Sequence, residues 1–253
     1  MVQTKDNTAG VIPKNAEEAK YLCFLANRIL ANEGLFDAFG HVSLRNPENP
    51  GTFFQSRSCS PEFVTEEDII EIDLDGNVVT ETDMRPYGER FIHSEILKQR
   101  PDVKAVYHGH PPEVVALTAA GIPYIPVTHT GAIFYEEVPV YDAYDITNAT
   151  LVCTPPEAQR VARCFGQGRA CLMKNHGLIV AGEGVVEMVM GAVFFRDNCN
   201  ALIQAYTLGG GKISRMSREM GLVALEKHIR HRGVLERTWN YWLKRAKKAM
   251  PDL

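Results

Sequence analysis

The sequence predicts an α/β fold in which helical layers cover a mixed or antiparallel sheet. Segments with helical spacing alternate with short apolar runs of strand character. Two of these runs are separated by Asp75, Gly76 and Asn77, a turn signal typical of a hairpin. The length of 253 residues suits one large domain. These observations favour α/β layers over a doubly wound parallel sheet.

The first hundred residues are expected to supply two helices and several short strands. The first helix begins after Asn15, which with Glu18 forms a capping box ahead of an apolar helical face. Strand character follows Gly40 and returns at residues 52–56. A second helical pattern is stopped by Pro101.

The remainder continues the alternation of strands and helices. Residues 103–110 are expected to form a strand, followed by a helix from about Pro112 to Ala120. The later expected elements are a strand at 122–129, a helix at 155–166, a strand pair or bent strand at 170–182 and a long, mostly buried helix at 184–209.

Three segments are expected: a polar tail at 1–14, a main domain at 15–210 and a helical extension at 211–253. From residue 212 onward, eleven Lys or Arg stand against four Asp or Glu, interleaved with apolar residues. This pattern predicts an amphipathic helical pair, packed on the same domain or on a neighbouring subunit. Trp239 and Trp242 favour a subunit interface, where aromatic residues are enriched.

Composition excludes several classes of protein. The net charge of −4 indicates neither a nucleic-acid partner nor an anionic membrane surface. The apolar stretch 178–195 contains Glu183 and Glu187, which argues against a membrane span. Six cysteines without a C-x-x-C motif predict reduced thiols in a cytoplasmic protein.

Histidines at strand ends are the main candidates for chemistry. His108 and His110 are two residues apart, so they project to the same side of a strand. His176 ends a second apolar run, and Glu89 lies in the first turn of the helix that leads into the His108 strand. Three imidazoles with a nearby carboxylate suit a catalytic divalent metal. The alternative is that each histidine only satisfies local hydrogen bonds; His93 is expected on a helix face, and His228 and His231 in solvent.

In combination, these motifs resemble the class II aldolase and adducin-like family. The matching segments are GHVS at 40–43, TEEDIIEIDLDG at 65–76, Glu89, RPDVKAVYHGH at 100–110 and NHG at 175–177, within a resemblance that runs from about residue 17 to 210. The resemblance implies a three-layer fold with a central, mainly antiparallel sheet between helical layers. It also implies a homotetramer, or a multiple of it, with active sites at subunit interfaces.

The resemblance also assigns roles to residues. It implies that His108, His110 and His176 hold one divalent metal per subunit and that Glu89 is the catalytic acid/base. The ligand chemistry suits Zn²⁺ and also accepts Mn²⁺. Family members place a tyrosine or a similar acid from the region of His129 into a neighbouring subunit's site, and Tyr135 and Tyr141 are both candidates.

The sequence departs from the family at its phosphate-binding turns. These positions and their neighbours carry other side chains: His41, Ser43, Arg57, Ser58 and Tyr87. A guanidinium pairs bidentately with a carboxylate, and a tyrosine ring offers a flat wall. We therefore expect a planar carboxylated substrate instead of a phosphosugar. The alternative for Arg57 is a structural ion pair with Glu62 or Glu66.

The segments around these substitutions resemble one branch of the family, the decarboxylases of hydroxylated aromatic or heteroaromatic dicarboxylates. The substrates of that branch include 3-hydroxy-2-methylpyridine-4,5-dicarboxylate, from vitamin B6 degradation. The resemblance implies a metal-dependent, non-oxidative decarboxylase, a carboxy-lyase. Two alternatives are an aldolase that cleaves a carboxylated, non-phosphorylated substrate and a non-catalytic binding module like the adducin head, which does not require a metal site.

Overall fold

The structure is a computed structural model that describes residues 13–229 and 231–253. In this part of the chain, a seven-stranded sheet has the order β3-β2-β1-β4-β7-β6-β5. Its neighbouring strands are antiparallel, except that β5 and β6 are parallel. The strands are β1 (His41–Arg45), β2 (Thr52–Ser56), β3 (Ile69–Asp73), β4 (Ala105–Gly109), β5 (Val140–Tyr141), β6 (Ala170–Met173) and β7 (Gly177–Gly182).

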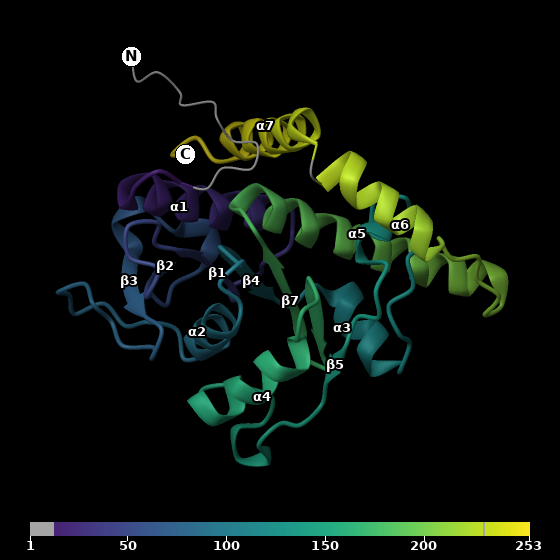
Figure 1. Cartoon of the computed structure of the whole chain (residues 1–253), viewed down its shortest axis with the longest axis horizontal. Coiled ribbons are helices and arrows are strands. Elements are labelled where there is room, and N and C mark those ends of the chain that lie inside the picture. Colours follow the sequence, from purple (N-terminus) through teal and green to yellow (C-terminus); the bar gives the residue numbers. More distant parts are fainter. Residues whose placement is uncertain (1–12, 230) are drawn as a thin grey trace.

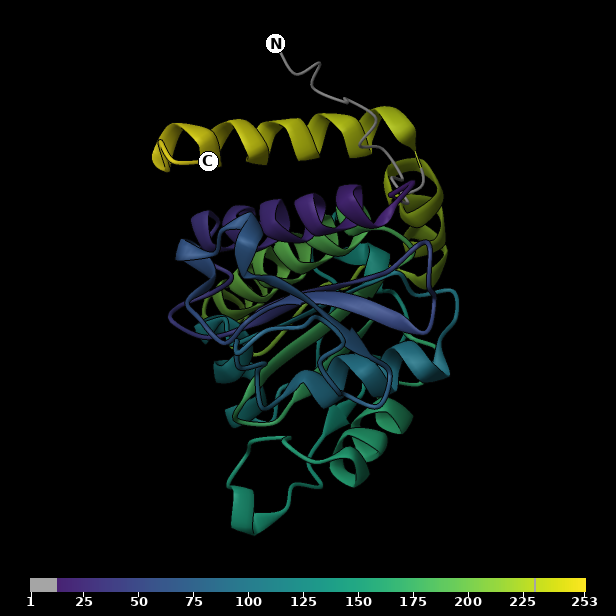
Figure 2. The same cartoon turned by 90° about the vertical axis from the view of Figure 1, so that its left-hand side faces the viewer.

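Helices cover both faces of the sheet. α1, α5 and α7 lie on one face, and α2 and α4 lie on the other (Figures 1 and 2). This arrangement is the expected α/β fold with a mainly antiparallel sheet between helical layers. The helices are α1 (Ala16–Asn32), α2 (Arg90–Gln99), α3 (Pro112–Ala119), α4 (Pro155–Phe165), α5 (Val185–Gly209), α6 (Arg218–Ala224) and α7 (Arg232–Ala249).

The period-two alternation of the strands divides the apolar residues between two cores. On β2, Phe54 joins the core beneath α1 and α5, whereas Phe53 joins the core beneath α2 and α4. On β4, Tyr107 and Val106 divide in the same way. Every strand residue of β4 is buried, because both faces of the sheet are covered.

Two expected strands differ from the structure. The return strand of the hairpin after β3 is reduced to a single bridge between Ile72 and Val78. No strand forms at 122–129 in the described chain. There, the side chain of Asn198 on α5 accepts hydrogen bonds from the backbone N–H groups of Val127 and Thr128 and donates one to the carbonyl of Ile125. A buried side chain thus replaces the strand partner that the backbone would otherwise need.

The C-terminal extension packs on its own chain. α7 contacts α1 and α5. Its two tryptophans, Trp239 and Trp242, are buried and belong to the same apolar core as residues of α1 and α5. The expectation that they line a subunit interface is therefore wrong for these two side chains. Residues 1–12 of the expected tail and the side chain of His228 lie outside what the structure describes. Among the described helices, none combines the length and apolar character needed to cross a bilayer.

Candidate metal centre

The site forms where β4 ends and β7 begins. His108 is on β4, and His110 follows its last residue. His176 lies in the tight turn between β6 and β7, immediately before Gly177. Because β4 and β7 are antiparallel neighbours, with Gly109 opposite Leu178, the end of one lies beside the start of the other. The fourth residue, Glu89, is the N-cap of α2.

These four residues converge. One ligand atom from each of Glu89, His108, His110 and His176 lies within 4.8 Å of all the others. The ring centroids of the three histidines are 4.9 to 5.0 Å apart. The carboxylate oxygens of Glu89 are 3.5 Å from His108 Nε2 and 3.7 Å from His176 Nε2. Glu89 and His176 are 87 residues apart in the sequence, and the sheet topology brings them together.

Two glycines allow this close approach. A Cβ at Gly177 would lie 2.3 Å from the carbonyl oxygen of Gly109 and 2.9 Å from Cδ2 of His110. A Cβ at Gly109 would lie 2.4 Å from the hydroxyl of Tyr107. The glycines of the H-G-H and N-H-G motifs therefore serve the packing: a side chain at Gly177 would push the segment that carries His176 away from the end of β4, and one at Gly109 would collide with Tyr107 and the carbonyl of Leu35.

The protonation of the histidines suits metal binding. His108 Nδ1 is 3.1 Å from the carbonyl oxygen of Leu178, an acceptor that fixes the hydrogen on Nδ1 and leaves a lone pair on Nε2. In the described chain, the Nε2 atoms of His108 and His110 are buried without a hydrogen-bond partner. Burial and neighbouring His108 lower the pKa of His110 and of His176 to about 4, so both rings are neutral at neutral pH, the form that can bind a metal. This donor set fits a divalent transition metal.

Glu89 is an ionised carboxylate in this setting. Burial raises the pKa of its carboxyl, but the nearby rings of His108 and His176 and the hydrogen bond from the N–H of Val152 outweigh burial and hold the pKa below its usual range. The Val152 N–H donates to Oε1 over 3.0 Å. Glu89 can therefore act as a ligand or a base before substrate binds.

His93 lies on the face of α2 that packs against the sheet. It is fully buried beneath β1, with Nε2 2.7 Å from His41 Nδ1 and Nδ1 2.7 Å from Ser43 Oγ. The ring of His41 lies 5.3 Å from that of His108, the residue opposite it on β4. The spacing of Glu89 and His93 by one helical turn was the available signal, since it places both on one face of α2.

Arg57 pairs with an acid that was not expected. Its Nε donates to Asp68 Oδ1 over 2.6 Å, instead of to Glu62 or Glu66. Asp68 also accepts from the backbone N–H of Thr65 at the start of a short 3-10 helix, Glu66–Asp68. The Arg57 side chain stays 41% exposed, and its terminal nitrogens make no hydrogen bond in the described chain. Asp68, the last residue of the TEED motif, thus binds the Nε edge of the guanidinium and leaves the terminal nitrogens without a partner in the described chain.

The remaining predicted substrate residues lie near a row of side chains that crosses three strands, from His108 on β4 through His41 on β1 to Arg57 after β2. Continuing the β1–β2 register, in which Ser43 faces Gln55, sets Arg57 opposite His41. Tyr87 is buried with its ring 4.5 Å from that of His41, and its hydroxyl donates to the carbonyl of Cys59. Burial raises the pKa of Tyr87 to about 12. Ser58 is exposed, and its backbone N–H donates to the carbonyl of Arg85.

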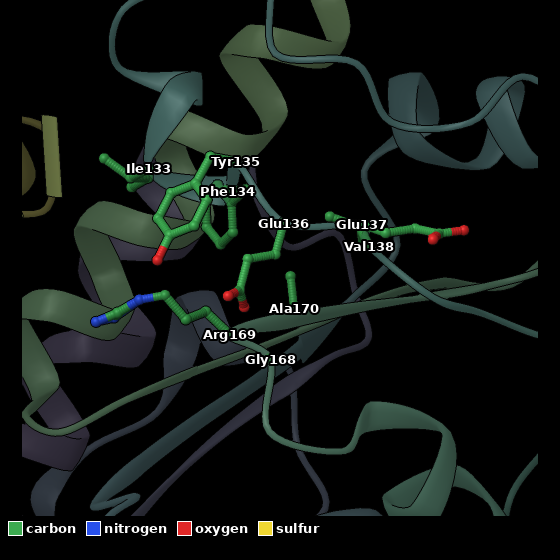
Figure 3. A pocket seen from close by; sticks show the side chains of 9 residues that line it. All are labelled: Ile133, Phe134, Tyr135, Glu136, Glu137, Val138, Gly168, Arg169 and Ala170. Carbon is green, nitrogen blue, oxygen red and sulfur yellow. The ribbon is translucent and has the colours of Figure 1, made fainter. Parts of the chain in front are cut away.

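Of the two candidate tyrosines, Tyr135 lies at the other end of β6 from the four-residue cluster, whereas Tyr141 pairs with Met173 at the near end. Tyr135 lines a small pocket of about 30 Å³ beside Ala170 at the start of β6, whereas His176 follows the end of that strand. Figure 3 shows Tyr135 and its neighbours around this pocket. Tyr141 is buried and donates to the carbonyl of Ala143. Instead, the sequence analysis missed Tyr144, whose ring is 6.3 Å from that of His176.

Comparison with known proteins gives the family. The model of the "Class II Aldolase and Adducin N-terminal domain" family matches residues 22–203. The chain belongs to this family. The match contains all four residues of the cluster and the row that includes His41 and Arg57.

Several relatives of this class II aldolase family member are decarboxylases. A "3,4-dihydroxyphthalate decarboxylase" of Arthrobacter keyseri is 33% identical over 74% of this chain and 78% of its own length. The "Decarboxylase tropJ" of Talaromyces stipitatus is 28% identical, over 85% of this chain and 89% of its own. Among solved structures, an "L-fuculose 1-phosphate aldolase from Glaciozyma antarctica PI12" shares the fold, with a TM-score of 0.79, 21% identity and coverage of 96% of both chains.

Proposed function

We propose that the chain is a divalent-metal-dependent, non-oxidative decarboxylase of a hydroxy-substituted aromatic or heteroaromatic dicarboxylate. The observation that carries this proposal is the convergence of three imidazoles and one carboxylate on a common point. The relatives named decarboxylases support a carboxy-lyase, and the fold family supports a metal-dependent site.

His108, His110 and His176 would hold the metal, as Zn²⁺ or Mn²⁺, one per subunit. When bound, the metal supplies a Lewis acid that stabilises negative charge on the substrate oxygens next to the bond that breaks. His108 is kept in the ligating tautomer by the Leu178 carbonyl. The packed β4–β7 pairing holds the ligands in place before substrate arrives.

Arg57 and His41 would bind the second carboxylate of the substrate. Neighbouring strands are about 4.8 Å apart, so the row from His108 through His41 to Arg57 spans about 10 Å. That length suits a planar ring with carboxylates at both ends of the row. Asp68 occupies one edge of the Arg57 guanidinium and leaves the terminal nitrogens for a bidentate pair. The ring of Tyr87 packs against that of His41 and would hold His41 in its place in the row.

Glu89 would move the proton. Its carboxylate is ionised and can take the hydroxyl proton of the bound substrate. As the carbon–carbon bond breaks, carbon dioxide leaves and its electron pair stays on the ring carbon. Glu89 then returns the proton to that carbon, and solvent reprotonates the hydroxyl. The net reaction consumes one proton from water for each carbon dioxide released.

A carbon dioxide release assay tests the proposal. The metal-loaded protein would be offered ortho-hydroxy aromatic and pyridine dicarboxylates, including 3-hydroxy-2-methylpyridine-4,5-dicarboxylate. A sugar phosphate and a 4-hydroxy-2-oxo acid would serve as controls. We expect carbon dioxide from one dicarboxylate, abolished by chelation and restored by Zn²⁺ or Mn²⁺. An aldehyde from a control, with no carbon dioxide from any dicarboxylate, would instead identify an aldolase. Failure to retain any divalent ion would favour a binding module.

We also propose that the chain acts in the cytoplasm as a homotetramer, or a multiple of it, with Tyr135 or a similar acid completing a neighbouring subunit's site. The pocket position of Tyr135, remote from its own chain's cluster, supports a role in trans. Light scattering gives the oligomeric state. Mixing a Tyr135→Phe chain with a Glu89→Gln chain then tests for shared sites, because mixed oligomers regain activity only if the two residues act across an interface.

A further inference from the structure

Beneath the proposed substrate row, three buried polar side chains form a hydrogen-bonded chain. Ser43 Oγ lies 2.7 Å from His93 Nδ1, and His93 Nε2 lies 2.7 Å from His41 Nδ1. All three residues are at most 2% exposed. They come from two elements, since Ser43 and His41 are on β1 and His93 is on α2. A buried polar chain of this kind, outside the four-residue cluster, calls for a function.

Neutral imidazoles leave two ways to place the hydrogens along this chain. Burial lowers the pKa of His93 to about 3, so its ring has one donor and one acceptor. In the first arrangement, Ser43 donates to His93 Nδ1, His93 Nε2–H donates to His41 Nδ1, and His41 carries its hydrogen on Nε2. In the second, both bonds are reversed, and His41 Nε2 presents a lone pair.

The surroundings of Ser43 favour the first arrangement. In the described structure, His93 Nδ1 is the hydrogen-bond partner of the Ser43 hydroxyl. Gln55, which lies opposite Ser43 on β2, makes no side-chain hydrogen bond in the described chain. If His93 donated to Ser43, the hydroxyl hydrogen would be buried without an acceptor, which is costly. The first arrangement gives every hydrogen of the chain an acceptor.

We propose that Ser43 and His93 are positioning residues that hold His41 in the Nε2–H tautomer, as a fixed donor to an anionic group of the substrate. The tautomer of a histidine is set by the hydrogen bond that its other nitrogen makes. His41 lies directly opposite the metal-ligating His108, so its free nitrogen borders the cluster. A donor suits the carboxylate, whereas a lone pair would repel it. The identity of the anion rests on the proposed function; the tautomer does not.

The proton positions can be observed without any substrate. Nitrogen-15 NMR of the full chain, labelled at histidine and loaded with Zn²⁺, distinguishes the two tautomers of each ring. The signals are assigned by their loss in His41→Gln and His93→Gln. We expect both His41 and His93 as Nε2–H tautomers. Finding His41 as the Nδ1–H tautomer would overturn the proposal, whether or not the protein decarboxylates any compound.

Two buried serines beside His93 provide a matched pair. Ser43→Ala removes the donor at the end of the chain and should let His41 redistribute between tautomers. Ser94→Ala removes an equally buried hydroxyl from α2, one that donates to the carbonyl of Phe91, and should leave both rings as in the unmodified protein. Equal spectra for the two variants would mean that Ser43 is structural only.

Kinetics on the accepted dicarboxylate then separates positioning from structure. Glutamine reaches the place of His93 Nε2 and can donate to His41, whereas asparagine reaches only the place of Nδ1. We expect His93→Asn to raise KM about tenfold, the effect of one hydrogen bond, with kcat and metal content little changed. His93→Gln should recover most of that loss. Equal losses in both variants would contradict a donor role for His93.

Discussion

The two ends of the central strands differ in how their charged and polar groups are satisfied. At the start of β6, Arg169 pairs with Glu187, and Arg100 pairs with Asp102 nearby. At the opposite end, the Nε2 atoms of His108 and His110 are buried without partners in the described chain. Paired groups stabilise the fold, whereas converging imidazole lone pairs beside a carboxylate suit a metal ion. Within one chain, the candidate metal centre and these ion pairs therefore lie at opposite ends of the strands.

Removing a metal ligand should have the largest effect. His176→Ala removes one of the three imidazole ligands, and Glu89 would have to replace it as a ligand while also serving as the base. We expect metal content to fall to a small fraction and decarboxylation to become undetectable, as after chelation. Elemental analysis of the purified protein checks this. His231→Ala, at an exposed histidine that caps α7, should retain the metal; a metal-replete His176→Ala protein would refute the ligand assignment.

Glu89→Gln should give the next largest effect. The amide cannot carry the proton, so kcat should fall by about 10²- to 10⁴-fold, while the three histidines keep the metal. Steady-state rates and metal analysis of the same sample check both statements. Glu95→Gln is the matched control, because Glu95 is also buried on α2 but pairs with Lys98. Substantial activity in Glu89→Gln would remove Glu89 from the acid/base role.

Arg57→Ala should act on substrate binding more than on the chemical step. Loss of a bidentate carboxylate contact should raise KM by about 10- to 100-fold. Asp68→Asn, which releases the held edge of the guanidinium, should raise KM by less. Arg245→Ala, an exposed arginine on α7 that pairs with Glu33, is the control. An unchanged KM in Arg57→Ala would mean that Arg57 only anchors the loop.

Breaking the ion pair at the start of β6, the end of the strands away from the metal centre, should affect the stability of the protein and leave metal and substrate binding unchanged. Glu187→Gln breaks the largely buried pair with Arg169 and should reduce the free energy of unfolding by about 1–3 kcal/mol. The melting temperature should fall by a few degrees, while metal content and KM stay as they were. Calorimetry and the carbon dioxide assay measure the two quantities. A large loss of metal would mean that the ends of the strands are coupled.

Local patterns in the sequence were sufficient for much of the fold and for the members of the four-residue cluster. Alternating and helical spacings predicted the long helix α5, the β6–β7 pair and a mixed or antiparallel sheet, and the family resemblance implied that the sheet is mainly antiparallel. The H-G-H spacing placed two imidazoles on one side of a strand because side-chain direction in a strand repeats every two residues. The prediction of a strand at 122–129 was wrong because backbone N–H groups of this segment donate to the side chain of Asn198, a residue far along the chain.

What only the tertiary structure decided is which polar groups are paired and which are left open. The sequence could nominate Arg57 and His41, but it could not show that Asp68 binds the first or that His93 is hydrogen-bonded to the second. Such partners come from different elements, brought together by sheet register and helix packing rather than by spacing along the chain. Burial then sets the protonation of the histidines, because desolvation depends on every layer above them.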